Sequence, residues 1–403
     1  MSKTMLRSCL AWFFLFLACS DNSLPAADSK SAAPEIAPYV SFLETQKVDS
    51  VTYILNLFDT HDMVILCERD HREMTQYEFL FRLVSHPRFV QSVGHIFTEV
   101  GSQAQEKNIE SFLTTPGLSP KETEQRLLTI YQDLSWMVFW EKTNFFDFLR
   151  QVQRFNSVAS SSQKIHVHPC DLIFDWSKAT PETYAAFRKG PLLQRDRLMA
   201  DHVLQGFRGL GKTDPRRRNA LVIMNYRHAF NDRFGFEGRK EENTGRFLFE
   251  ALPGKVANVL ISTLGLQENA NDHVVSQKVL QDGKWDAAFA VAGDPEKGFP
   301  FAGNPFGKDS FDLYPFFPHQ FTYQDVFTGM VFVTPLEKYR ISYGIPGISS
   351  PAFIKEVQKR FKVTGEDLSD EQVGQMVKNL DTLQQKKVAD LPRHVSEIRK
   401  WLK

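Results

Sequence analysis

The chain has 403 residues and a formal net charge of zero, because 48 Lys and Arg are balanced by 48 Asp and Glu. This balance excludes a protein that binds nucleic acid through its net positive charge, and it excludes a polybasic attachment to lipid headgroups. Beyond a short leader, about 370 residues remain, which is enough for one large α/β domain or two smaller ones.

The first residues have the pattern of an export signal. Lys3 and Arg7 precede an apolar stretch that is too short to span a bilayer, and small residues follow it. We therefore predict a signal peptide over 1–19. The rival interpretation is ordinary cleavage near Ala26. Residues 20–38, rich in Ser, Ala, Asp and Pro, are predicted to form a flexible tether. No second stretch is long enough to cross a membrane.

The end of this leader, Phe16 to Cys19, resembles the cleavage site of bacterial lipoproteins, in which the cysteine carries the lipid. The resemblance implies a lipid anchor at Cys19 as the only membrane contact. Both interpretations of the leader predict export, either to the bacterial cell envelope with a lipid anchor or to the periplasm.

The stretch from Met63 to Ser102 predicts a βαβ unit. Residues 63–67 form an unbroken apolar run, typical of a strand that is buried on both faces. Apolar residues then recur at helical spacing from Met74 to Val84, and Ile96 with Phe97 opens a second strand. Strand, helix and strand in so short a span make the two strands parallel.

Polar residues stand where these strands end. Glu68 and His71 follow the first strand, and Glu99 ends the second. Because parallel strands finish at one edge of a sheet and ligands bind there, these side chains are expected to meet.

Later segments continue the alternation of strands and helices, again with polar residues after the strands. A third strand is followed by Asp171, a helix carries Arg195, and a fourth strand ends in Asn225 with His228 shortly after it. The expected helices cover 40–59, 103–113, 121–140, 181–207 and 244–252, and the expected later strands cover 164–170, 220–224, 256–262 and 331–334. We predict a mostly parallel sheet flanked by helices in one α/β domain over 39–340. A helical C-terminal region follows over 341–403.

Other features allow two interpretations each. Cys67 and Cys170 are expected either as neighbours that oxidise or, more simply, as buried free thiols. His166 and His168 alternate onto one face of a strand, as a metal pair or as residues packed against a helix. The aromatic stretch 136–148 is expected to be core, with a cover over a pocket as the alternative. The aromatic stretch 298–322 is expected to be a lid over the site, with a passive surface loop as the alternative.

The strand-end residues suggest two kinds of chemistry. A histidine beside an ionised carboxylate gains basicity, so His71 is a candidate base for activating water, with Glu68 and Glu99 orienting it. His228 would assist, and Arg195 would bind an anion or stabilise an oxyanion. Alternatively, Glu68, His71 and His228 would hold a divalent metal.

The order of these motifs resembles that of the erythromycin esterase, ChaN and Tiki/TraB superfamily. Cys67-Glu68-Arg69-Asp70-His71 is similar to its opening Gly-Glu-x-x-His, and Phe97-Thr98-Glu99 to its strand that ends in Glu. Residues 195–200 resemble its Arg-Asp-x-x-Met-Ala helix, and 224–228 its closing motif, with Asn225 where the esterases have His. The resemblance covers roughly residues 58–335.

The resemblance implies a mixed sheet with its site at the strand ends, but it implies different activities. Esterase relatives use the residue that matches His71 to activate water, Tiki and TraB relatives are proposed metalloproteases, and ChaN-like relatives are exported haem-binding lipoproteins. Our first hypothesis is an exported hydrolase that acts on an ester or amide-type small molecule. The alternatives are a haem- or metal-binding lipoprotein without catalysis, and a family member that only binds a partner.

Overall fold

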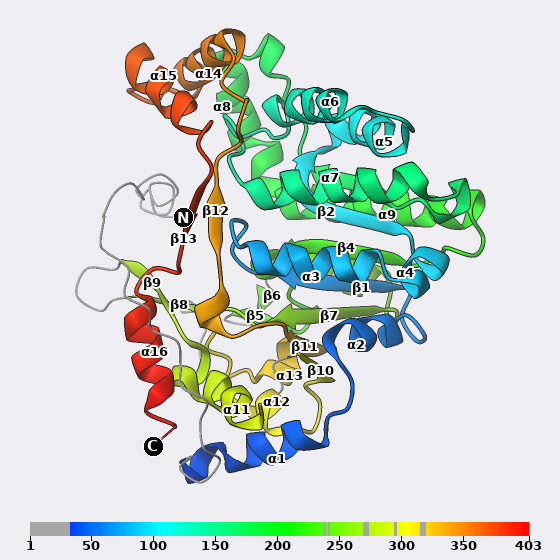
Figure 1. The fold of residues 1–403 in the computed structure, drawn as a ribbon, viewed down its shortest axis with the longest axis vertical. Helices are drawn as coiled ribbons and strands as arrows, with labels where there is room; N and C mark the ends of the chain where they lie inside the picture. Colours follow the sequence, from blue (N-terminus) through cyan, green and yellow to red (C-terminus); the bar gives the residue numbers. More distant parts are fainter. Residues whose placement is uncertain are drawn as a thin grey trace.

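A computed structural model describes residues 33–236, 239–240, 242–268, 274–293, 296–314 and 320–402 (Figure 1). The predicted signal peptide with Cys19, and most of the predicted tether, lie outside these residues. The described end of the tether differs from the prediction, because helix α1 (Ala37–Thr45) begins within it after a short 3-10 turn. Ile36 and Tyr39 are buried there, which anchors this segment.

A seven-stranded sheet runs through the centre of the molecule. Its strands, in spatial order, are β10 (Lys297–Pro300), β11 (Gly329–Phe332), β7 (Val256–Ile261), β1 (Met63–Glu68), β4 (Ala220–Asn225), β2 (His95–Ser102) and β3 (His166–Asp171). Every neighbouring pair is parallel except β10 and β11. The predicted mostly parallel sheet is therefore confirmed, with one antiparallel strand at its edge.

Helices cover both faces of this sheet, as Figure 1 shows. Alternate residues of β1 supply the two cores: Val64 and Leu66 pack on one face, and Met63 and Ile65 pack on the other. This explains the unbroken apolar run, since a strand buried on both faces needs apolar residues at every position. The first face carries α2 (Ser50–Leu57), α3 (Met74–Val84), α4 (Pro87–Ser92), α5 (Glu106–Thr114), α6 (Pro120–Gln132) and α7 (Thr143–Val158). The second carries α1, α9 (Arg195–Thr213), α10 (Thr244–Ala251) and α11 (Lys284–Ala292).

The predicted βαβ unit is present, with one addition. Helix α3 has the predicted bounds, and β1 and β2 run in the same direction. However, β4 lies between them and pairs with both, so the two strands are not direct neighbours. Three strand ends, rather than two, thus lie side by side at the predicted site.

Local signals divide two of the predicted helices, and a third is shorter than predicted. Asp49 caps α2 by accepting the amide of Thr52, which divides the expected helix 40–59 into α1 and α2. Gly190 and Pro191 divide 181–207 into α8 (Pro181–Lys189) and α9. The expected helix 121–140 ends at Gln132.

The C-terminal region extends along the whole molecule. It contains β12 (Ile341–Tyr343), α14 (Pro351–Thr364), α15 (Asp370–Asn379), β13 (Gln384–Lys386) and α16 (Leu391–Arg399). In Figure 1, α14 and α15 lie at one end beside α8, and α16 lies near the other end beside α11. Phe353, Val357 and Phe361 of α14 belong to the core that α3 and α7 also fill. The region therefore contributes to the main core.

The aromatic stretch 298–322 is core in its described part. Phe299, Phe301, Phe306 and Phe311 are buried, so the lid hypothesis is wrong for these residues, while 315–319 lie outside the described part. Small elements complete the fold: β5 (Gly235–Phe236), β6 (Arg239–Lys240), β8 (Gly265–Glu268), β9 (Val275–Lys278), α12 (Pro305–Lys308) and α13 (Tyr323–Val326). Among the described helices, we find none with both the length and the apolar character needed to cross a bilayer.

Candidate active site

The candidate site lies at the C-terminal ends of the central strands. Glu68 ends β1, Asn225 ends the neighbouring β4 at the same register position, and Asp171 ends β3. Glu99 lies in β2, where the pairing with β3 shifts register between Thr98 and Ser102. The parallel sheet therefore brings these polar residues to one edge, as the sequence predicted.

His71 lies between two buried carboxylates. It occupies the turn between β1 and α3, and its Nδ1 donates to Glu68 Oε2 at 3.0 Å while its Nε2 lies 3.0 Å from Glu99 Oε1. The indole of Trp140 packs against its ring at 5.3 Å between centroids. Both nitrogens of His71 thus face acceptors, and the ring is fixed from three sides.

Glu99 joins His71 to the second predicted histidine. Its Oε1 accepts the backbone amide of Asn225 at 3.0 Å in addition to the contact with His71. Its Oε2 is buried, forms no hydrogen bond, and lies 3.4 Å from Nε2 of His228. One carboxylate therefore faces a different histidine with each oxygen.

His228 is oriented by a carboxylate that sequence reasoning had not assigned to the site. It lies in the 3-10 turn after β4, and its Nδ1 is 2.7 Å from Asp196 Oδ1. Asp196 in turn accepts from both the amide and the hydroxyl of Thr244, at the start of α10. Since Asp196 follows Arg195 on α9, the helix that supplies the predicted arginine also orients His228.

Arg195 is occupied by contacts within the protein. Its Nε and Nη2 donate to the two carboxylate oxygens of Asp171, at 2.8 and 3.1 Å, and its Nη1 is 3.1 Å from His228 Nε2. Asp171 also accepts the indole N–H of Trp136 at 2.8 Å. Arg195 therefore bridges β3 and His228, and its expected role in binding a substrate anion stays a prediction.

These contacts fix the charges in the site. Burial lowers the pKa of His71, but the charges and hydrogen bonds of Glu68 and Glu99 outweigh burial and raise that pKa from 6.5 to about 10. Burial raises the pKa of Glu68. Burial also opposes ionisation of Glu99, but the charges around it, including those of His71 and Arg195, outweigh burial and hold its pKa well below the usual value. At neutral pH, His71 is an imidazolium ion and Glu99 is ionised.

One part of the site has the donors for a metal ion. Ligand atoms of Glu68, His71 and Glu99 lie within 4.8 Å of one another, and carboxylate and imidazole are ligands that divalent transition metals accept. Glu99, rather than the predicted His228, completes this group. The Oε2 of Glu99, which accepts no hydrogen bond, is a further acceptor beside this group.

The structure brings together all five predicted residues: Glu68, His71, Glu99, Arg195 and His228. The sequence did not identify Asp196, Trp136 or Trp140 as neighbours of the site, although the apolar stretch 136–148 had been considered as a cover. Cys67 and Cys170 are buried free thiols, so the simpler of the two expectations holds.

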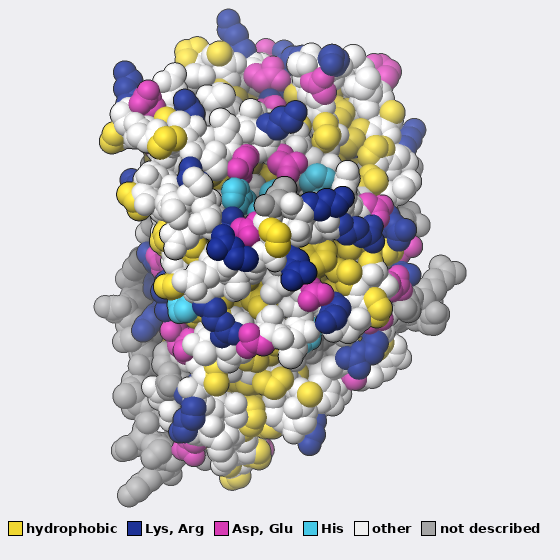
Figure 2. Space-filling model, turned by 90° about the vertical axis from the view of Figure 1, so that its right-hand side faces the viewer, with side chains coloured by type: hydrophobic (Ala, Val, Ile, Leu, Met, Phe, Trp, Pro, Cys, Tyr) yellow, Lys and Arg dark blue, Asp and Glu magenta, His cyan; other side chains and the backbone are white. Residues whose placement is uncertain are grey.

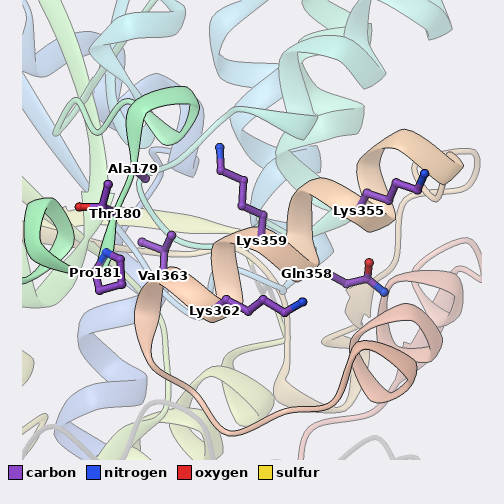
Figure 3. Close-up of a pocket in the computed structure, with 8 residues that line it drawn as sticks. All are labelled: Ala179, Thr180, Pro181, Lys355, Gln358, Lys359, Lys362 and Val363. Carbon is purple, nitrogen blue, oxygen red and sulfur yellow. The ribbon is translucent and has the colours of Figure 1, made fainter.

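A separate pocket lies away from these residues. Figure 3 shows this pocket, of about 370 Å³, between the start of α8 and helix α14. Lys355, Lys359 and Lys362 line it, but Lys359 donates to the carbonyl of Trp176 and Lys362 pairs with Asp370. None of the candidate site residues lines this pocket.

Comparisons with known proteins identify similar folds only. No family model matches the chain, and no curated protein matches it. Similar solved structures include a Bacillus cereus protein, which has 10% identity and a TM-score of 0.42 over 75% of this chain and 97% of its own. A succinoglycan biosynthesis protein has 10% identity and a TM-score of 0.44 over 76% and 94%.

A mutant of the erythromycin esterase EreC in its open conformation is also similar, with 10% identity and a TM-score of 0.42 over 75% of this chain and 96% of its own. Erythromycin esterases belong to the superfamily that the sequence motifs resemble. Nothing about activity or substrate follows from these similarities.

Proposed function

We propose that this chain is a hydrolase that cleaves an ester or amide-type bond in a small molecule at the C-terminal edge of its sheet. The observation that carries the proposal is the pair of histidines on opposite oxygens of the buried Glu99. Hydrolysis needs one group that takes a proton from water and another that gives a proton to the leaving group. We assign one of these roles to each histidine.

His228 is the proton acceptor. The guanidinium of Arg195 can only donate, so its contact with Nε2 of His228 requires a lone pair on that nitrogen. The proton of the neutral ring is then on Nδ1, where Asp196 accepts it. A carboxylate that orients a neutral histidine in this way is the usual arrangement for a general base.

His71 is the proton donor. Because its pKa is raised to about 10, its Nε2 carries a proton at neutral pH. This reverses the role expected from the sequence, in which His71 was the base, since two carboxylates stabilise the imidazolium more than one does. In the reaction, water replaces Nη1 of Arg195 at Nε2 of His228 and gives that nitrogen a proton as the water oxygen bonds to the carbonyl carbon. The bond from this carbon to the leaving oxygen or nitrogen then breaks, and the leaving group takes the proton of His71. Return of the extra proton from His228 to His71 restores both rings, and Glu99 stabilises each ring while it is protonated.

Replacement of each histidine tests this proposal. We expect His71→Gln and His228→Gln each to lower kcat/KM by about 100-fold or more on a panel of nitrophenyl esters, lactones and anilides, the range typical of general acid–base groups. His61→Gln, at the half-buried turn after α2 and among none of the contacts of the candidate site, is the matched control and should retain full activity. Circular dichroism checks that each variant is folded. Unchanged hydrolysis in both site variants would reject the mechanism.

A second candidate function is metal binding at Glu68, His71 and Glu99, favoured by the spacing of their ligand atoms. A divalent cation there would lower the pKa of a bound water and supply a nucleophile. Calorimetric titration with Zn²⁺ or Mn²⁺ alone tests it. Glu68→Gln should then weaken binding, and a wild-type protein that binds neither ion at this site would contradict it.

Two sequence-based predictions remain proposals here. We propose export to the cell envelope with a lipid anchor at Cys19, supported by the leader pattern, and metabolic labelling with a palmitate analogue tests it. Haem binding stays a prediction. Haemin added to the purified protein should produce a shifted Soret band if the protein binds haem, and His71→Ala should abolish that shift if the candidate site holds the iron.

A further inference from the structure

Four histidines and two glutamates gather beside the N-terminal halves of β2 and β3, and none of them belongs to the candidate active site. This histidine–glutamate cluster comprises His95 of β2, His166 and His168 of β3, His202 of α9, and Glu106 and Glu110 of α5. His95 and His166 are the first residues of their strands and pair in register. In Figure 2, which views the molecule from this side, histidine and acidic side chains lie next to one another on the surface.

Carboxylates hold two of these imidazoles by the same nitrogen. Glu106 accepts from Nδ1 of His168 at 3.1 Å, and Glu110 contacts Nδ1 of His166 at 3.0 Å. Each contact places the proton on Nδ1 and leaves Nε2 as the potential donor to a ligand. Histidines that bind metals in proteins usually have their second nitrogen held in this way, which fixes the ring and makes the ligating nitrogen more basic.

The Nε2 of His168 is hydrogen-bonded to another imidazole nitrogen. It lies 3.2 Å from Nδ1 of His95. Two imidazole nitrogens on a tetrahedral ion, each bound at about 2.0–2.1 Å, lie roughly 3.3 Å apart. Ring stacking preserves this arrangement, because His95 stacks on His168 and His166, and Phe97 stacks on the other side of His168. The spacing is therefore already that of two ligands on one ion.

Charge and access also suit a cation. His95 is almost completely buried, and its ring contacts those of His166 and His168 and none of the carboxylates of the described residues. Arg217, the cation beside His95, is paired with Asp214. The two glutamates bring negative charge to the cluster, and about a fifth of the His168 side chain is exposed, so water reaches it.

We propose that His95 and His168 bind a divalent transition-metal ion such as Zn²⁺ between Nδ1 and Nε2, with water completing its coordination and Glu106 orienting His168. The ion takes the place of the proton that the two rings share in its absence. It would join β2 to the edge strand β3. This site is independent of the proposed hydrolysis.

Titration with Zn²⁺ or Co²⁺ alone tests the site, in a His71→Ala background that removes the other candidate metal group. We expect one equivalent to bind by calorimetry, with Co²⁺ giving visible bands of a nitrogen- and oxygen-liganded ion. His168→Gln should weaken binding more than 100-fold, and Glu106→Gln should weaken it about 10- to 100-fold as an orienting residue. His61→Gln is the control and should bind as tightly as the background protein.

Two outcomes would overturn the proposal. The first is a His71→Ala protein that binds no equivalent of either ion at neutral pH. The second is a His168→Gln variant that binds as tightly as its background. If His168→Gln is misfolded by circular dichroism, His95→Gln and Glu106→Gln supply the same comparison, and unchanged binding in the folded variants has the same consequence.

Discussion

Glu99 determines the state of both histidines. Its two oxygens face Nε2 of His71 and Nε2 of His228, and its position inside β2 leaves it nearly inaccessible to water. In such surroundings a charge acts strongly on its neighbours, because little solvent screens it. The ionised Glu99 therefore keeps His71 protonated, and it also attracts any proton that His228 takes from water.

The pH dependence of the reaction follows from this charge. As a proton donor, His71 must be protonated, so kcat/KM should be lost as the pH rises through about 10. Glu99→Gln removes one of the two charges that raise the pKa of His71, and this loss should then occur at lower pH. A pH–rate profile of each protein on a nitrophenyl ester measures the pH at which this activity is lost. A rate that instead increases towards pH 10 would show that His71 acts as the base.

Arg195 should matter for stability as well as for rate. Replacing it with Leu leaves the buried Asp171 with only Trp136 and the amide of Leu172 as partners. Breaking a buried ion pair by removing one partner costs roughly 3–5 kcal/mol, and the remaining donors place the expected loss near the lower value. Urea unfolding of Arg195→Leu measures the change. Asp201→Ala, at an exposed position on the same helix, is the control and should change stability little.

Among the secondary-structure elements, helix α10 positions His228 indirectly. Thr244 binds Asp196, and the next residue, Gly245, lies so close to the chain after His228 that a Cβ would be 2.5 Å from the carbonyl oxygen of Phe230. Only glycine permits this approach, because the obstructing atoms belong to the backbone. The sequence offered no signal for it beyond a glycine near a helix start.

Gly245→Ala should therefore move α10 away from the site. We expect a loss of roughly 1–3 kcal/mol of stability, as for other overpacked positions, together with a lower kcat. Gly209→Ala on α9 is the matched control, since no atom lies within 4 Å of its added methyl group. That variant should gain up to about 1 kcal/mol from helix propensity. Equal stability in the two variants, measured by thermal unfolding, would disprove the close-approach argument.

At the scale of the whole molecule, the C-terminal region is part of the folding unit. Phe353, Val357 and Phe361 are buried in the main core, and the buried Arg360 donates to the carbonyls of Gln132 and Val138. Each such apolar side chain contributes about 1.5–3 kcal/mol on burial, while a whole domain is stable by only about 5–15 kcal/mol. Loss of the region therefore removes a large share of the stability.

Deletion of residues 345–403 should consequently abolish the cooperative unfolding transition and increase the binding of a hydrophobic dye. Lys355→Ala, at an exposed position of α14, is the control and should unfold like the wild type. A truncated protein with a sharp melting transition near that of the full chain would show that the region is a separate appendage.

The sequence predicted the sheet, and the meeting of the polar residues at one edge of it, because both depend on local patterns. Apolar runs identify buried strands, and the polar residues at their ends follow from parallel strand direction alone. The neighbours of these residues depend on long-range packing. Nothing in the sequence near Asp196 indicates that His228 is its partner. The raised pKa of His71 could not be predicted either, because it depends on two carboxylates that reach the same ring.

During synthesis, the strands that form the site leave the ribosome at different times. A ribosome releases β1 and β2 more than a hundred residues before β4, the strand that joins them laterally. Until β4 is inserted, the partial sheet has a gap between Glu68 and Glu99. Contacts between such distant segments slow folding, so the site is expected to assemble late, and N-terminal fragments that end before Ala220 should lack it entirely.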